Sequence, residues 1–280
     1  MTITRTCMWL MALACWSAEG QPKLEMVPFA EPQCAFAGSK ANVKAVFHNA
    51  GDADFSGEMG MKLFLTSSST VAPLDERPWK KLNVLAGQTI IESAPLEMPK
   101  VERVTKVLIR WVEPVSHVAG DAEVIVYPTN LLHELKLLLG DDGATFGVLD
   151  PHRQFKPALE QAEIKFIDLA ETEMSGFSGK LALVGPCDPD DPEWDGLADR
   201  IQAVAKKGTP VVWIQRSPRD EDATPPSYYV APQNRTAVVV AQPELVSNMF
   251  DNPRSQLNLL HFCKLALLPE IPALPNLSRK

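Results

Sequence analysis

The sequence has few of the residues that mark specialised proteins. It contains five cysteines and five histidines, with no CxxC, no HExxH and no other metal-ligand spacing, which excludes a recognisable zinc site and a disulfide-rich scaffold. Only 27 basic residues stand against 35 acidic ones, so the net charge of −8 creates no field that attracts nucleic acid. Beyond residue 20 no apolar run is long enough to cross a bilayer. We expect no cofactor, no metal, no nucleic-acid partner and no transmembrane span.

The first twenty residues are typical of an export signal. Arg5 precedes a short apolar core at residues 7–16, and residues 18–20, Ala-Glu-Gly, place small residues at a cleavage site. Cleavage there predicts a secreted or periplasmic bacterial protein. Residues 12–15, Ala-Leu-Ala-Cys, also resemble a bacterial lipobox. A lipid anchor at Cys15, and with it an outer-membrane lipoprotein, is therefore the alternative.

Removal of the signal leaves three cysteines in the mature chain. They are Cys34, Cys187 and Cys263, an odd number that leaves at least one thiol unpaired. In an oxidising compartment, a disulfide between Cys187 and Cys263 is one alternative. The other interpretation is that Cys34 and Cys263 are small buried residues, which is more typical of such cysteines.

The mature chain divides into two patterns near Pro128. Residues 21–128 alternate apolar and polar positions in short β-branched runs separated by turn residues, which predicts an antiparallel β-sandwich. Residues 129–280 alternate strand-like and helix-like segments, which predicts a parallel sheet covered by helices on both faces. The expected fold class is thus a two-domain chain, an N-terminal Ig-like antiparallel sandwich followed by a C-terminal three-layer α/β domain. The predicted strands of the second domain are 146–150, 164–168, 180–184, 210–214 and 236–240.

Short motifs in each half resemble known families. Residues 49–51, Asn-Ala-Gly, and the turn at 86–88, Ala-Gly-Gln, resemble Ig-like modules of bacterial adhesion type. In the second half, a strand ending in Gly-Pro at 185–186, an acidic loop, a helix and the stretch 207–214 resemble class I glutamine amidotransferase-like domains. That resemblance implies a flavodoxin-like fold, which also occurs as a non-catalytic domain beside β-galactosidase-type glycoside hydrolases.

The catalytic residues that this resemblance implies are missing from the sequence. Aligning the family's Gly-x-Cys-x-Gly elbow with the end of strand 210–214 places Gln215 at the nucleophile position, and an amide cannot act as one. The family's His-x-Glu pair is absent as well, because no histidine occurs between His152 and His261. The resemblance therefore implies a catalytically degenerate domain.

The remaining candidate residues end predicted strands or follow them, at the edge where α/β folds bind ligands. Cys187 is the low-probability nucleophile with His152 as its base, although nearby carboxylates disfavour a thiolate. The acidic run beyond it is a weak cation site, but prolines with aspartates before a helix more often cap that helix. The ligand-binding candidates are Asp150, Arg153, Cys187, Asp188, Gln215 and Arg216, and the weak metal candidates are Asp188, Asp190 and Asp191.

Three functions remain open from the sequence. The favoured one is a secreted, non-catalytic accessory or interaction protein with an unknown protein or glycan partner. Its link to extracellular carbohydrate processing is implied by the amidotransferase resemblance. The alternatives are a cysteine-dependent amidase or hydrolase that uses Cys187 and His152, and a carbohydrate-binding module.

Overall fold

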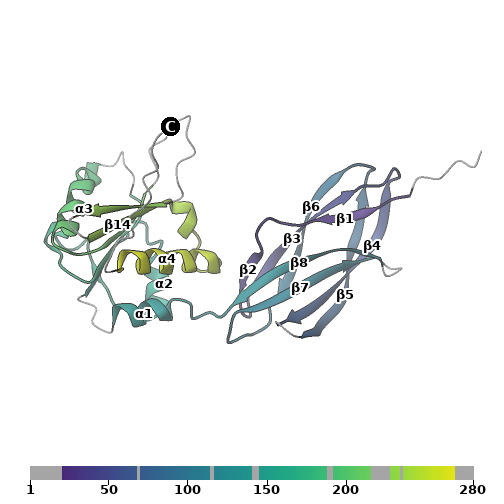
Figure 1. Cartoon of the computed structure of the whole chain (residues 1–280), viewed down its shortest axis with the longest axis horizontal. Helices are drawn as coiled ribbons and strands as arrows, with labels where there is room; N and C mark the ends of the chain where they lie inside the picture. The colour runs from purple at the N-terminus through teal and green to yellow at the C-terminus, as the bar shows by residue number, and fades with distance from the viewer. Residues whose placement is uncertain are drawn as a thin grey trace, which may run out of the picture. The chain divides into compact units, whose positions relative to one another are not determined.

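The structure, a computed structural model, describes residues 21–67, 70–113, 117–140, 145–187, 192–215, 228–233 and 236–268. The first eight strands form two sheets (Figure 1), with the orders β1-β3-β6 and β2-β8-β7-β4-β5. β1 is antiparallel to β3 and β4 to β5, whereas β2 runs parallel to β8. The bounds are β1 Leu24–Val27, β2 Gln33–Phe36, β3 Lys40–Asn49, β4 Phe55–Thr66, β5 Val71–Val84, β6 Thr89–Glu97, β7 Thr105–Val112 and β8 Val118–Tyr127.

Three aromatic side chains join these two sheets. Phe47 of β3 contacts Trp79 of β5 and Trp111 of β7, and the ring centroids of each pair among the three lie 6.0 Å apart. Phe47 and Trp111 are completely buried. Because β3 belongs to one sheet and β5 and β7 to the other, the sheets pack face to face over this cluster, which buries a large apolar area.

Asn49 at the end of β3 organises the turns at one end of these strands. Its side chain is fully buried, and its amide nitrogen donates to the carbonyls of Ala53 at 2.8 Å and Val84 at 3.1 Å. Its side-chain oxygen accepts from the backbone amides of Lys23 and Gly51, each at 3.1 Å. Both polar atoms of the side chain, the amide nitrogen and the oxygen, are therefore hydrogen-bonded, as a buried amide requires.

The remaining strands form a six-stranded sheet with the order β10-β9-β11-β12-β14-β13. Its first five strands are parallel, and β13 is antiparallel to β14 at the edge. The strands are β9 Phe146–Leu149, β10 Ile167–Asp168, β11 Leu181–Val184, β12 Val211–Ile214, β13 Tyr228–Gln233 and β14 Thr236–Ala241. The α-helices among the described residues are α1 His133–Leu139, α2 Lys156–Gln161, α3 Leu197–Lys206 and α4 Pro253–Ala266, and 3₁₀ turns cover Met174–Gly176, Pro192–Trp194 and Pro243–Val246.

Alternate residues of these strands pack into two separate hydrophobic cores, one on each face of the sheet. Val148 and Leu183 pack with buried residues of α1, α2 and α4. Their neighbours Leu149 and Val184 point to the other face and pack with α3. This alternation explains why these strands are apolar almost throughout, because side chains on both faces are buried.

The predicted fold class is wrong. Among the described residues strands outnumber helices, and the five- and six-stranded sheets each combine parallel and antiparallel neighbours. This differs from the expected Ig-like antiparallel sandwich followed by a three-layer parallel domain of the amidotransferase or flavodoxin type. The parallel β2–β8 pair breaks the expected pattern of the first half, and the antiparallel β13 that of the second. Hydrophobic periodicity identifies a strand but does not give the direction of its neighbour, which is why the β2–β8 pairing was missed. β13 was not among the predicted strands.

By contact density the chain separates into two compact units. One holds the chain up to Glu31 together with Asn42–Pro95 and Leu108–Glu123. The other holds Pro32–Ala41, Leu96–Val107 and the chain from Val124 onward. The predicted division into 1–20, 21–128 and 129–280 stays a prediction. No helix within the described ranges is both long enough and apolar enough to cross a membrane.

Candidate functional site

The candidate site lies at the carboxyl ends of β9 and β11, which are neighbours in the six-stranded sheet. The helix after β9, α2, contributes to the core on one face, whereas the helix after β11, α3, contributes to the core on the other. The chain segments that follow β9 and β11 therefore pass to opposite faces of the sheet. In α/β sheets such a point is where ligands usually bind.

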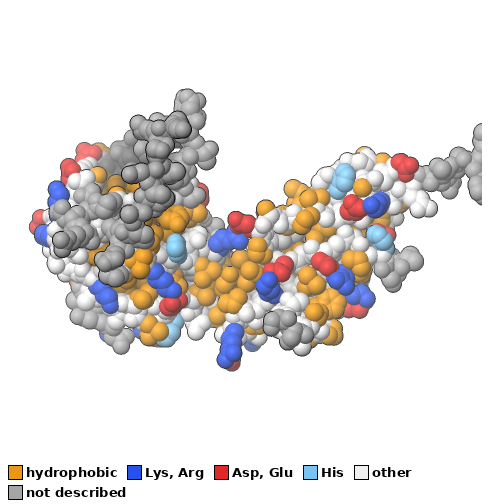
Figure 2. All heavy atoms as spheres, in the orientation of Figure 1, with side chains coloured by type: hydrophobic (Ala, Val, Ile, Leu, Met, Phe, Trp, Pro, Cys, Tyr) orange, Lys and Arg blue, Asp and Glu red, His pale blue; other side chains and the backbone are white. Residues whose placement is uncertain are grey.

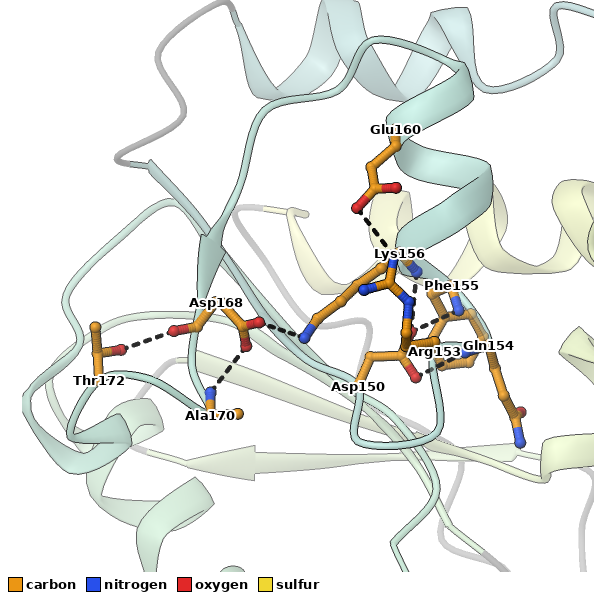
Figure 3. A network of polar contacts seen from close by, with 9 residues as sticks. All are labelled: Asp150, Arg153, Gln154, Phe155, Lys156, Glu160, Asp168, Ala170 and Thr172. Carbon is orange, nitrogen blue, oxygen red and sulfur yellow. Dashed lines mark hydrogen bonds and ion pairs between the residues drawn. The ribbon is translucent and has the colours of Figure 1, made fainter.

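Asp150, the first residue after β9, is buried and turns back onto its own loop. Its Oδ1 accepts a hydrogen bond from the backbone amide of Gln154 at 2.9 Å. Its Oδ2 accepts from the amides of Phe155 at 2.7 Å and Lys156 at 2.9 Å (Figure 3). Since these amides precede or begin α2, the carboxylate satisfies donors that a helix start leaves unpaired.

Gly185 packs closely against this loop from the end of β11. Its amide donates to the carbonyl of Leu149 at 2.6 Å. A Cβ atom at this position would lie 3.3 Å from Asp150 Oδ1 and 3.3 Å from the ring of Phe155. The chain's own backbone and side chains thus lie close beside Asp150, and a side chain at position 185 would require these neighbours to shift by a few tenths of an ångström.

Lys156 and Asp168 form an ion pair beside the same strand ends. Lys156 Nζ lies 2.5 Å from Asp168 Oδ2, and the lysine side chain is only 9% exposed. Asp168 Oδ1 also accepts from the amide of Ala170 at 3.0 Å (Figure 3). Burial raises the pKa of Asp168, but the hydrogen bonds from Lys156 and Ala170 and the nearby positive charges outweigh it, so the pKa lies below its ordinary value.

The other predicted residues of the β9 loop point to solvent. Arg153 is exposed, has left-handed backbone with φ of 51°, and places Nη2 3.6 Å from Glu160 Oε1. His152 is also exposed, and no hydrogen bond or ion pair involves it among the described residues. An exposed pair such as Arg153–Glu160 adds little stability.

The structure places the remaining candidates at separate strand ends. Cys187 follows β11, is half-buried, and directs its thiol to the carbonyl of Gly185 at 3.6 Å. Gln215 follows β12, and its backbone amide donates to the carbonyl of Ala241 at 3.0 Å, which extends the β12–β14 pairing. Asp188, Asp190, Asp191 and Arg216 lie outside the described residues. Within the part that is described, no group of three or more His, Cys, Asp and Glu side chains is arranged to hold a metal ion.

No disulfide joins the three cysteines among the described residues, so the alternative of a Cys187–Cys263 disulfide is not realised in this structure. Cys263 in α4 is fully buried, and burial raises the pKa of its thiol to about 12. This confirms the interpretation of Cys263 as a small buried residue. Its thiol stays protonated and chemically inert in the folded protein.

A separate surface hollow of about 380 Å³ lies at the end of α1. It is lined by Lys136, Gly140, Glu163 and Lys165. Lys136 Nζ lies 3.1 Å from Glu163 Oε2, so these two charges balance each other. The side chains in this hollow offer no nucleophile and no general base paired with one.

Sequence reasoning missed Lys156 and Asp168 as partners, although one signal was present. Asp168 ends the predicted strand 164–168, so it belongs at the same edge of the sheet as Asp150. The pairing itself depends on β10 lying beside β9, an order that the sequence does not give.

Comparisons with known proteins leave the family of this chain open. No family model and no curated protein sequence matches it. Among solved structures, a Pseudomonas fluorescens alkylpurine DNA glycosylase bound to abasic-site DNA matches at TM-score 0.31 and 10% identity, over 38% of this chain and 31% of that one. A Listeria innocua β-glucosidase matches at TM-score 0.28 and 16% identity, over 38% and 16%. Spo0M, a sporulation control protein of Bacillus subtilis, matches at 0.28 and 9%, over 42% and 55%.

These likenesses carry no argument about function, because their TM-scores are low and the glycosylase and the β-glucosidase are covered over less than a third of their length. The resemblance to glutamine amidotransferases and to Ig-like adhesion modules is nevertheless wrong. No family model supports it, and among the described residues β2 is parallel to β8 in the first half and β13 is antiparallel to β14 in the second. The family of the chain is therefore not the one that its short glycine motifs indicated.

Proposed function

We propose that this chain is an exported, non-catalytic interaction protein that binds a protein or glycan ligand. The observation that carries the proposal is that the chain's own atoms occupy the space at the carboxyl ends of β9 and β11. Asp150, the carboxylate best placed there for ligand or acid–base chemistry, uses both oxygens to accept three backbone amides. A general base needs a free oxygen within hydrogen-bond reach of substrate. This arrangement supports a structural role for Asp150.

The charge balance at the same edge supports the proposal further. Lys156 and Asp168 neutralise each other at 2.5 Å, and the lysine is almost completely buried. Electrostatic stabilisation of a transition state requires donors or charges aimed at the reacting atoms rather than at one another. The pair is instead suited to fixing the start of α2 against the end of β10.

Export is the second part of the proposal and rests on the sequence of residues 1–20. A signal of this type directs the mature chain to the periplasm or the medium, and Cys15 lipidation would tether it to a membrane.

The competing function is a hydrolase in which His152 activates Cys187. The position of Cys187, three residues after the end of β11, favours it, because catalytic groups often follow strands. A thiol nucleophile, however, needs a base held in hydrogen-bond reach and a third group that orients it. His152 is exposed and has no hydrogen bond among the described residues, so the geometry supports the interaction protein better.

The test combines binding and turnover on the same samples. The wild-type chain, Cys187→Ala and the matched thiol control Cys34→Ala are assayed on glycan arrays and on chromogenic amide and glycoside substrates. We expect saturable glycan binding that is equal in all three, and turnover no higher than buffer. Turnover that Cys187→Ala abolishes and Cys34→Ala retains would establish the hydrolase instead.

A further inference from the structure

Proline is distributed unevenly among the strands. Four prolines lie within described strands, and all four are in strands at the edge of a sheet: Pro73 and Pro78 in β5, Pro95 in β6 and Pro232 in β13. None occurs in the described strands that have a neighbour on each side. Because proline has no amide hydrogen for a ladder, it is tolerated at an edge and hinders a further strand from pairing there.

β5 is the edge at which this protection matters most. It is 14 residues long, which at about 3.3 Å per residue gives roughly 45 Å of edge. Every side chain from Val71 to Glu76 is exposed, including Val71 at 63% and Leu74 at 41%. A long, exposed and partly apolar edge is the kind of strand that pairs with another chain.

Each proline of β5 is followed directly by a β-bulge. In the register with β4, Pro73 is opposite Phe64 and the next paired residue is Asp75, so Leu74 has no partner. Pro78 is opposite Gly60 and the next paired residue is Lys80, so Trp79 has none. A bulge inserts an unpaired residue, bends the strand and increases its twist, which spoils the straight ladder that an added strand needs.

We call each proline of β5 together with the bulge that follows it (Pro73–Leu74 and Pro78–Trp79) a proline–bulge step. Charged side chains separate these two steps. Asp75, Glu76 and Arg77 lie between them, with Lys62 Nζ 2.9 Å from Glu76 Oε1 and Arg77 Nε 3.6 Å from Asp75 Oδ2. Over β5 and its neighbours basic and acidic side chains interrupt the apolar surface (Figure 2). A second strand would have to pack its own side chains against these charges.

We propose that the two proline–bulge steps of β5 block strand addition and so prevent this edge from pairing with the β5 edge of a second copy of the chain. The second bulge also directs Trp79 into the aromatic cluster, where its ring centroid lies 6.0 Å from that of Phe47. The first bulge, at Leu74, has an exposed side chain and no such contact with the core. Pro73 therefore reports on edge protection separately from packing.

The experiment compares the mass and hydrogen exchange of four full-length proteins: wild type, Pro73→Thr/Pro78→Thr, the same double variant with Leu74→Lys, and Pro28→Thr. Pro28 is an exposed proline outside the strands, which makes it the matched control. We expect the double variant to shift to twice the wild-type mass by light scattering, with slower exchange of β5 amides. Leu74→Lys should reverse both changes, and Pro28→Thr should cause neither.

A double variant that is folded but keeps the wild-type mass and β5 exchange at every concentration would overturn the proposal. So would a wild type already paired through a protected β5, or the same shift in Pro28→Thr. If the double variant does not fold, Pro73→Thr alone is judged by the same two readouts, because that residue is remote from the Trp79 bulge in the β4–β5 register.

Discussion

Replacing Asp150 by alanine should destabilise the six-stranded sheet strongly. The change removes the acceptor of three backbone amides, two of them in fully buried hydrogen bonds. Leaving a buried donor unpaired costs about 1–3 kcal/mol, so two such donors alone predict a loss of roughly 2–6 kcal/mol in the free energy of unfolding. The close packing of Gly185 against Oδ1 leaves little room for water to replace the carboxylate.

The matched control is Asp199→Ala, because Asp199 is an exposed acidic residue in the first turn of α3. Surface substitutions of this kind usually change stability by less than about 0.5 kcal/mol. Urea unfolding with hydrogen exchange of the β9 and β11 amides measures both variants. If Asp150→Ala stays within about 0.5 kcal/mol of wild type, the structural role of this carboxylate is refuted.

Three further predictions follow from the described contacts. Asn49→Ala should lower the free energy of unfolding by about 3 kcal/mol because four hydrogen bonds, one buried and three part-buried, lose their partner, whereas the exposed Asn83→Ala should change it little; urea unfolding measures both. The folded-state pKa of Asp168 lies below the ordinary 3.8, so the ionised carboxylate stabilises the fold above pH 3.8. The difference in free energy of unfolding between wild type and Asp168→Asn should therefore shrink as the pH falls below 3.8, and an equal difference at pH 3 and pH 7 would contradict this. Cys263 should resist maleimide until urea unfolds the chain while Cys34 labels in the native state, and mass spectrometry of labelled peptides decides.

Local structure could be predicted where short-range signals decide it. Gly208 marks the end of α3 because its φ of 94° is a left-handed conformation that favours glycine. β11 and β12 were recognisable as short apolar runs. The predicted strand 164–168 shortens to two residues because Glu163 is left-handed and the Ile164 amide bonds back to the Leu159 carbonyl of α2.

The errors concern relations between distant elements. β13 contains Pro232, which argues against a strand unless the strand is at an edge, and edge position depends on the complete sheet order. Asp150 was predicted as the last residue of a strand, whereas β9 ends one residue earlier, and its role depends on the loop turning amides 154–156 back onto it. Neither the direction of β2 nor the Lys156–Asp168 contact follows from periodicity, because each needs an element distant in sequence.

The most direct test of the central claim is the alkylation rate of Cys187 by iodoacetamide, measured across about pH 6–9 in wild type and in His152→Ala. If the strand-end residues serve structure rather than catalysis, the two proteins should react at equal rates at every pH, since His152 makes no hydrogen bond among the described residues and so does not act on the thiol. Rapid alkylation of wild type near pH 6 that His152→Ala abolishes would contradict the account and identify a catalytic thiol.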